Sequence, residues 1–158
     1  MFELPWLSLL LVLPLLGAVL VAFARGQDAA GTAANAKALA LWVSLLTAGL
    51  AVLMTAQFDP QGGLQFVEKY AWIPALNIHY HVGVDGLSLA LILLTVLLTP
   101  LCIGLSWQSI TQHVKAYLAA FLVLEALVIG VFVALDLVLF YVFWEAVLLP
   151  MFLLIGLW

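Results

Sequence analysis

The chain has 158 residues, of which 68% are hydrophobic and only 8% are charged. Because soluble domains carry about 25% charged residues, this composition excludes a soluble globular protein and predicts an integral membrane protein. The net charge of −4 offers no basic surface for a nucleic acid, and a single cysteine, Cys102, excludes a disulfide within the chain.

Five apolar segments are each long enough to cross a bilayer, so the sequence predicts an all-α polytopic membrane protein. The first segment has no basic residue before it, and we therefore expect a retained span rather than a signal peptide. A Gly/Ala-rich polar loop at 25–37 separates it from the second. The five predicted transmembrane helices are 4–24, 38–57, 87–107, 116–135 and 137–158, all within one membrane domain, 1–158.

Apolar and polar residues alternate along the segment 64–84, as is typical of β-strands, and Pro74 separates its two halves. It predicts a short β-hairpin lying at the membrane surface. His79 and His81 share one face of the second strand, because strand side chains repeat every two residues. No third ligand of a suitable type is nearby, so we expect no metal site. Asp85 then provides the N-cap of the third helix.

Two acidic residues lie inside the predicted spans, whereas the other charged residues lie at helix ends or in connections. Glu145 is about midway along the fifth segment, and Glu125 is in the fourth. A carboxylate at bilayer depth is disfavoured by roughly 2.5–3.5 kcal/mol, so such residues are functional by default. No lysine or arginine lies in any span, so neither acid has a basic partner within these helices.

Pro150 follows Glu145 by five residues and leaves the carbonyl of Ala146 without its helical partner. A helix loosened beside an intramembrane acid predicts a proton or ion site. The alternative is structural: the acid pairs with a basic residue on a neighbouring helix and holds a bundle together.

The two acids are predicted to lie at similar depth. Glu125 precedes Asp136 by 11 residues and Glu145 follows it by nine. At a rise of about 1.5 Å per residue, both reach near the middle of a hydrocarbon layer about 30 Å thick. We favour an arrangement in which both carboxyl groups face one interior. Alternatively, Glu125 faces a different helix and pairs with a group in another chain.

The basic residues predict the orientation of the chain. Loops one and three carry Arg25, Lys37 and Lys115, whereas the second loop carries Lys69. By the positive-inside rule, loops one and three face the cytoplasm, and the amino terminus and the hairpin lie outside.

Three stretches resemble a known family. LDLVLFYVFWEAVLLPMFLLIGLW, at 135–158, looks like the fifth helix of the antiporter-like subunits of respiratory NADH:quinone oxidoreductase (complex I). EKYAWIP and HYHVGVDGLSL resemble the hairpin and third-helix entry of the M-type (chain 4) subunit. The resemblance covers about 67–158, and the first two helices fit by pattern only.

The resemblance implies a role for both acids. In that family the fifth-helix glutamate works with a lysine on a later helix, and the pair passes protons across the membrane. Glu145 occupies that position, and Glu125 corresponds to an acid found in part of the family. Because the family has about fourteen helices, we expect this chain to be a fragment or a member shortened to five helices.

The resemblance implies a membrane-arm subunit of a proton-pumping NADH:quinone oxidoreductase in the bacterial inner membrane. Its partners would be the other membrane-arm subunits, especially the paralogous antiporter-like chains. One cysteine cannot hold an iron–sulfur cluster, and we expect this chain to bind no cofactor. The resemblance implies that NADH, FMN, iron–sulfur clusters and quinone bind other subunits of the complex. The alternatives are a subunit of a multi-subunit Na⁺/H⁺ antiporter or membrane-bound hydrogenase, or a non-transporting scaffold or assembly protein.

Overall fold

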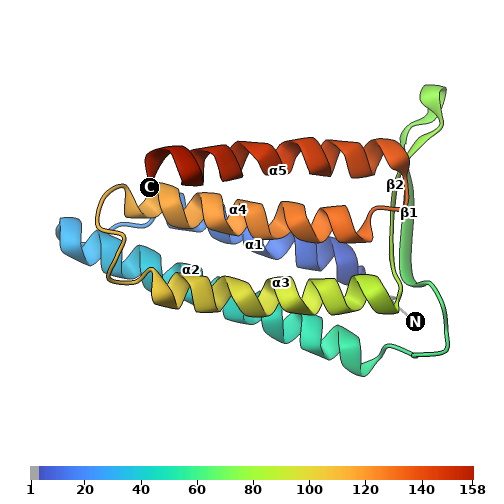
Figure 1. The fold of residues 1–158 in the computed structure, drawn as a ribbon, viewed down its shortest axis with the longest axis horizontal. Coiled ribbons are helices and arrows are strands. Elements are labelled where there is room, and N and C mark those ends of the chain that lie inside the picture. The colour runs from blue at the N-terminus through green and yellow to red at the C-terminus, as the bar shows by residue number, and fades with distance from the viewer. Residues whose placement is uncertain (1–3) are drawn as a thin grey trace.

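The computed structural model describes residues 4–158, which form five helices and one two-stranded antiparallel sheet (Figure 1). The predicted mainly helical class and the antiparallel strand pair are confirmed. The helices are α1 (Trp6–Ala22), α2 (Ala29–Ala56), α3 (Gly86–Leu105), α4 (Val114–Val133) and α5 (Leu137–Leu157), and the strands are β1 (Gln65–Ile73) and β2 (Ile78–Val84).

Four of the helices in the described part of the chain, α2 to α5, are long and apolar enough to cross a membrane. The remaining helix, α1, has 17 residues. At about 1.5 Å per residue, its length of about 26 Å falls short of a hydrocarbon layer about 30 Å thick. The predicted segment 4–24 is therefore helical over a shorter stretch than expected.

The prediction of a polar loop at 25–37 is wrong for most of these residues, because α2 already begins at Ala29. The carboxylate of Asp28 caps this helix and accepts a hydrogen bond from the amide of Gly31 at 2.6 Å. Alanine has the highest helix propensity, so the alanine-rich stretch after this cap is helical although it is not apolar enough to be read as a span. With 28 residues, α2 is about 42 Å long and extends beyond the hydrocarbon layer.

The helices lie side by side, and α4 contacts each of the other four (Figure 1). Two groups of buried apolar side chains hold the bundle together, one near the hairpin and one near the opposite end. Leu7, Met54, Ile92 and Ile129 belong to the first group, and Val21, Val43, Ile103 and Leu122 to the second. By contrast, α5 packs on the outside of the bundle, mainly against α4.

The hairpin lies at the end of the bundle where α1 and α5 begin (Figure 1). A short 3-10 turn at Pro74–Leu76 and a left-handed Asn77 (φ 54°) connect its strands. The carbonyl of His81 accepts a hydrogen bond from the amide of Leu135 at 2.8 Å. Strand β2 is thereby tied to the connection between α4 and α5.

Candidate functional site

Glu145 is held on α5, whose start is fixed by Asp136. The Oδ1 atom of Asp136 accepts hydrogen bonds from the amides of Val138 at 2.9 Å and Leu139 at 3.2 Å, so it satisfies two of the orphan donors of the first turn. The helix then continues without interruption through Pro150. Glu145 is therefore carried on a regular, capped helix.

The side chain of Glu145 is exposed on the surface of the described bundle. Of the side chains along α5, those of Leu139 and Pro150 alone are buried within residues 4–158. Tyr141 precedes Glu145 by one helical turn, so the two side chains lie on the same face of α5. The carboxyl of Glu145 thus lies on an apolar helix face that other groups can approach.

Glu125 has the opposite environment. Its side chain is 2% exposed, and it lies on α4 inside the bundle. Neither carboxyl oxygen has a hydrogen-bond partner among the described residues. Thr99 of α3 lies close enough to interact with the carboxyl, but its hydroxyl donates to the carbonyl of Thr95 at 3.0 Å. A buried polar group left without a partner costs about 1–3 kcal/mol, so packing alone gives no reason for an acid here.

The two acids match in depth but not in the direction they face. Each lies eight residues from the turn between the helices, Glu125 before Val133 and Glu145 after Leu137, which corresponds to about 12 Å along each axis. However, Glu125 is enclosed by the bundle, whereas Glu145 is exposed. The structure does not bring both carboxyl groups into the shared interior that we favoured.

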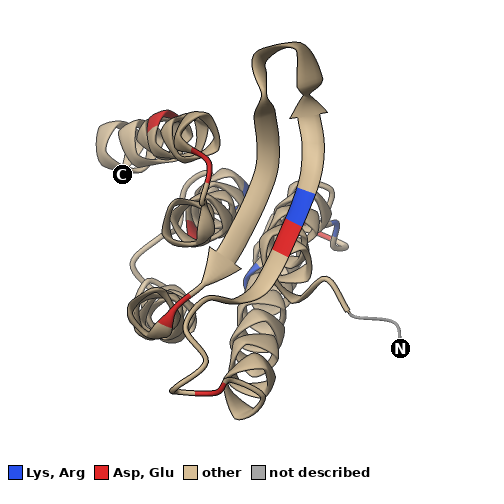
Figure 2. Ribbon diagram, turned by 90° about the vertical axis from the view of Figure 1, so that its right-hand side faces the viewer, with Lys and Arg blue, Asp and Glu red and all other residues tan. Residues whose placement is uncertain are grey.

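Basic residues are few in the described chain, and on the hairpin a basic and an acidic residue lie next to each other (Figure 2). Arg25 lies in a connection, Lys37 in the third turn of α2 and Lys115 in the first turn of α4. The Nζ atom of Lys37 donates to the carbonyls of Trp107 and Ile110. The Nζ atom of Lys115 donates to the carbonyls of Ala22 and Ala24. These lysines therefore bind the backbone at one end of the bundle rather than either intramembrane carboxyl.

Sequence reasoning missed the role of Glu68. This residue of β1 is 9% exposed, and its Oε1 atom accepts hydrogen bonds from the amides of Leu7 at 2.9 Å and Ser8 at 3.3 Å. Its Oε2 atom accepts from the hydroxyl of Ser8, which also contacts the hydroxyl of Tyr80 at 2.9 Å. The hairpin thus supplies the N-terminal cap of α1. The signal available in the sequence was Pro5, which has no side-chain acceptor to cap this helix.

The histidines of β2 make mainly local and backbone contacts, and the Nδ1 atom of His79 lies 3.1 Å from the carbonyl oxygen of Asn77. The amide of His79 donates to the Oδ2 atom of Asp136 at 3.2 Å. This hydrogen bond is the main reason why the pKa of Asp136 lies below its usual value. In the described part of the chain, no three His, Cys, Asp or Glu side chains form a cluster that could hold a metal ion.

One known protein family and several known proteins are similar in sequence to this chain. Residues 32–135 match the family described as NADH-ubiquinone oxidoreductase chain 4, amino terminus. The chain is 52% identical to "NADH-quinone oxidoreductase subunit M" of Rhodobacter capsulatus, over 96% of this chain and 29% of that protein. It is 42% identical to "NADH-ubiquinone oxidoreductase chain 4" of Mycosarcoma maydis, over 96% of this chain and 31% of that protein.

A solved structure shows the same fold. The chain superimposes on a chain of respiratory complex I from Thermus thermophilus, determined with bound NADH, with a TM-score of 0.75 and 25% sequence identity. The match covers 93% of this chain and 28% of that chain, so the present chain spans less than a third of the length of these relatives. With the family matched over 32–135 and the fold shared, this chain belongs to the NADH-ubiquinone oxidoreductase chain 4 family, whose bacterial relatives are named subunit M.

Proposed function

We propose that this chain works in the membrane arm of a proton-pumping NADH:quinone oxidoreductase, where Glu145 forms part of a proton path. The observation that carries this proposal is the position of Glu145, a carboxyl about 12 Å along an apolar helix and exposed on its outer face. An ionisable group at this depth is disfavoured unless it faces a partner or a polar path. Membership of the chain 4 family supports the same proposal.

In the proposed mechanism, quinone reduction elsewhere in the complex changes the electrostatic field along the membrane arm. The Glu145 carboxyl responds by exchanging its proton or by changing its ion partner, which is a basic residue on a later helix. Glu125 serves as a secondary proton site, because its two carboxyl oxygens are free of hydrogen bonds within residues 4–158.

The redox chemistry belongs to other subunits in this proposal. One cysteine, Cys102, cannot supply the thiolates of an iron–sulfur cluster, and it lies within the apolar helix α3. We infer that NADH, FMN, iron–sulfur clusters and quinone bind other subunits of the complex. The contribution of this chain to the enzyme is the passage of protons.

The proposed location is the bacterial inner membrane, with the amino terminus and hairpin outside. Arg25 in a connection, Lys37 in the third turn of α2 and Lys115 in the first turn of α4 lie toward one end of the bundle, whereas Lys69 lies in β1 at the other end. This asymmetry favours the first end as the cytoplasmic one. The partners are the other membrane-arm subunits, and the uncovered face of α5 suits contact with further apolar helices.

Purification of the chain from its native membrane tests the proposed assembly. We expect quinone-reductase subunits to co-purify with it and the isolated assembly to oxidise NADH with a quinone acceptor. Co-purification with subunits of a Na⁺/H⁺ antiporter or of a hydrogenase, without NADH:quinone activity, would contradict the proposal. A chain that purifies only as an assembly factor, absent from the active complex, would also contradict it.

A further inference from the structure

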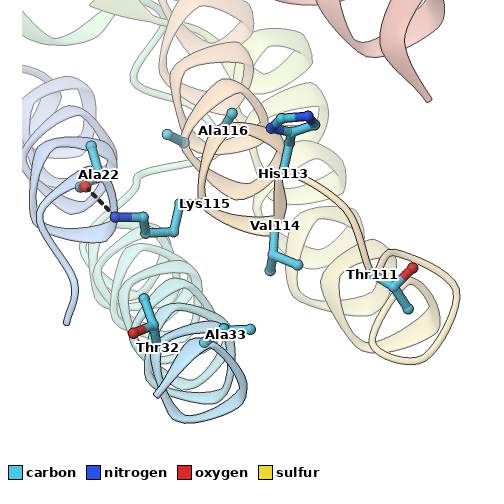
Figure 3. A pocket seen from close by; sticks show the side chains of 10 residues that line it. Ala22, Thr32, Ala33, Thr111, His113, Val114, Lys115 and Ala116 are labelled. Carbon is cyan, nitrogen blue, oxygen red and sulfur yellow. Dashed lines mark hydrogen bonds between the residues drawn. The ribbon is translucent and has the colours of Figure 1, made fainter. Parts of the chain in front are cut away.

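A cavity of about 550 Å³ lies between α1, α2 and α4 at the end of the bundle opposite the hairpin (Figure 3). Its volume lies in the range of roughly 300–1,000 Å³ that is typical of ligand sites. Alanine methyl groups form much of its wall, including those of Ala33 and Ala119, while Thr32, His113 and Lys115 add polar groups. The cavity therefore offers apolar walls with a few polar groups at one membrane surface.

The charge around this cavity favours an anion. The Nζ atom of Lys115 donates to the carbonyls of Ala22 at 3.1 Å and Ala24 at 3.4 Å, so carbonyls at the end of α1 rather than a carboxylate hold it in place. Arg25 and Lys37 lie at the same end of the bundle. The carboxylate of Asp28 in the adjoining loop keeps its negative charge while it accepts from the amide of Gly31, so the basic residues at this end outnumber it three to one.

The start of α4 adds backbone donors to the same cavity. His113 occupies the N-cap position in the left-handed conformation (φ 49°, ψ 37°), and its side chain makes no capping hydrogen bond. The following residues Val114, Lys115 and Ala116 form the first turn and line the cavity. First-turn amides without a cap and the positive end of the helix dipole both favour a bound anion.

We propose that this cavity binds the phosphate headgroup of an anionic phospholipid. The lysine and the α4 amides supply the phosphate site, and the alanine walls suit the glycerol and the upper acyl chain. Basic pockets between transmembrane helices at a membrane surface bind anionic lipid headgroups on this physical basis. The apolar wall favours a lipid over free phosphate, which shares the anionic group but gains nothing from the alanine methyl groups.

A photoreactive phosphatidylglycerol, with its diazirine near the phosphate, tests this site. The protein is purified in its native assembly and reconstituted into phosphatidylcholine vesicles that contain increasing amounts of this probe. After illumination, mass spectrometry measures labelling of the segments 22–37 and 111–119. We expect this labelling to saturate, and to fall on addition of unlabelled phosphatidylglycerol but not of the same amount of phosphatidylcholine.

Two variants change the cavity in different ways. Lys115→Gln removes the charge and should lower labelling about fivefold, and Ala33→Leu should lower it by filling the cavity while leaving Lys115 intact. The matched controls are Lys69→Gln, which removes a lysine on the hairpin, and Ala34→Leu, which enlarges an exposed neighbour on the same helix. Both controls should label like the wild-type protein. If Lys115→Gln does not assemble, Ala33→Leu alone decides.

Three results would overturn the proposal. Equal competition by phosphatidylcholine would show a contact that does not recognise the headgroup. Displacement of the probe by millimolar inorganic phosphate as effective as that by phosphatidylglycerol would identify a free-anion site. Undiminished labelling of Ala33→Leu would show that the lipid does not enter the cavity.

Discussion

Glu125 of α4 and Glu145 of α5 lie at nearly equal depth on adjacent antiparallel helices, yet one is enclosed and the other is exposed. Glu125 has no hydrogen-bond partner for either oxygen among the described residues. Glu145 faces outward from a helix that buries few of its side chains in the bundle. The two carboxyl groups therefore meet different surroundings, and replacing each should have a different effect.

Replacing Glu125 by leucine should leave the protein as stable or make it more stable. The buried carboxyl has no donor within residues 4–158, and the loss of an unsatisfied buried polar group should raise the free energy of unfolding by about 1–3 kcal/mol. Thermal unfolding of the purified assembly checks this, with Glu125→Gln as the polar control. A fall of about 2 kcal/mol or more in Glu125→Leu would show that the carboxyl supports the fold.

Replacing Glu68 by alanine should destabilise the amino-terminal end of the bundle. The amides of Leu7 and Ser8 lose their shared acceptor, at a cost of about 1–3 kcal/mol. Glu68→Gln keeps an acceptor and should lose less, and Lys69→Ala, at an exposed neighbour, should stay near the wild-type value. The measurements are the unfolding temperature and hydrogen exchange at these two amides. Unchanged exchange in Glu68→Ala would contradict the assigned cap.

Asp136 should make stability depend on pH in the acid range. Its folded pKa is lowered, mainly by the hydrogen bond from the His79 amide. A lowered pKa means that its contribution is fully present above the unfolded value of about 3.9 and is lost as the pH falls through the folded value. Unfolding measured against pH should show this loss in the wild-type protein. Asp136→Asn should flatten that part of the profile, and an identical profile in both proteins would contradict the prediction.

Replacing Gly130 by alanine should disturb the contact between α4 and α5. A Cβ atom at this position would lie 2.5 Å from the Phe143 ring, so the ring or the helix must move. Overpacking of this kind costs about 1–3 kcal/mol. Gly49→Ala is the matched control, because a Cβ there meets nothing within 4 Å and alanine stabilises a helix by about 0.5–1 kcal/mol relative to glycine. If Gly130→Ala unfolds at the same temperature as Gly49→Ala or above it, the predicted clash is wrong.

The sequence predicts those features that depend on local chemistry. Asp85 was predicted to cap the third helix, and its Oδ1 atom accepts from the amide of Ser88 at 2.7 Å. Alternation around Pro74 predicted the antiparallel strands that the structure contains. Length and hydropathy do not predict the early start of α2, because the alanines after Asp28 form a helix through propensity and capping.

Other features could not be predicted because they depend on packing between distant residues. The contact between Glu68 and Leu7 joins residues 61 positions apart. The number of residues between each acid and Asp136 predicts its depth. The direction in which each side chain points, however, depends on the rotation of its helix. Because α5 is apolar on all sides, no pattern in its sequence indicates which face packs on α4.

The most direct test of the account is proton translocation by the assembled complex that carries Glu145→Gln. Glutamine has nearly the same size and cannot exchange a proton, and the side chain is exposed, so assembly and NADH binding should be unchanged. In proteoliposomes energised with NADH and a quinone, we expect proton uptake to fall by about 100-fold, within the range of roughly 10²–10⁴ for a positioned proton-transfer group. Glu125→Gln should have a smaller effect. Unimpaired pumping by a fully assembled Glu145→Gln complex would contradict the role assigned to this residue.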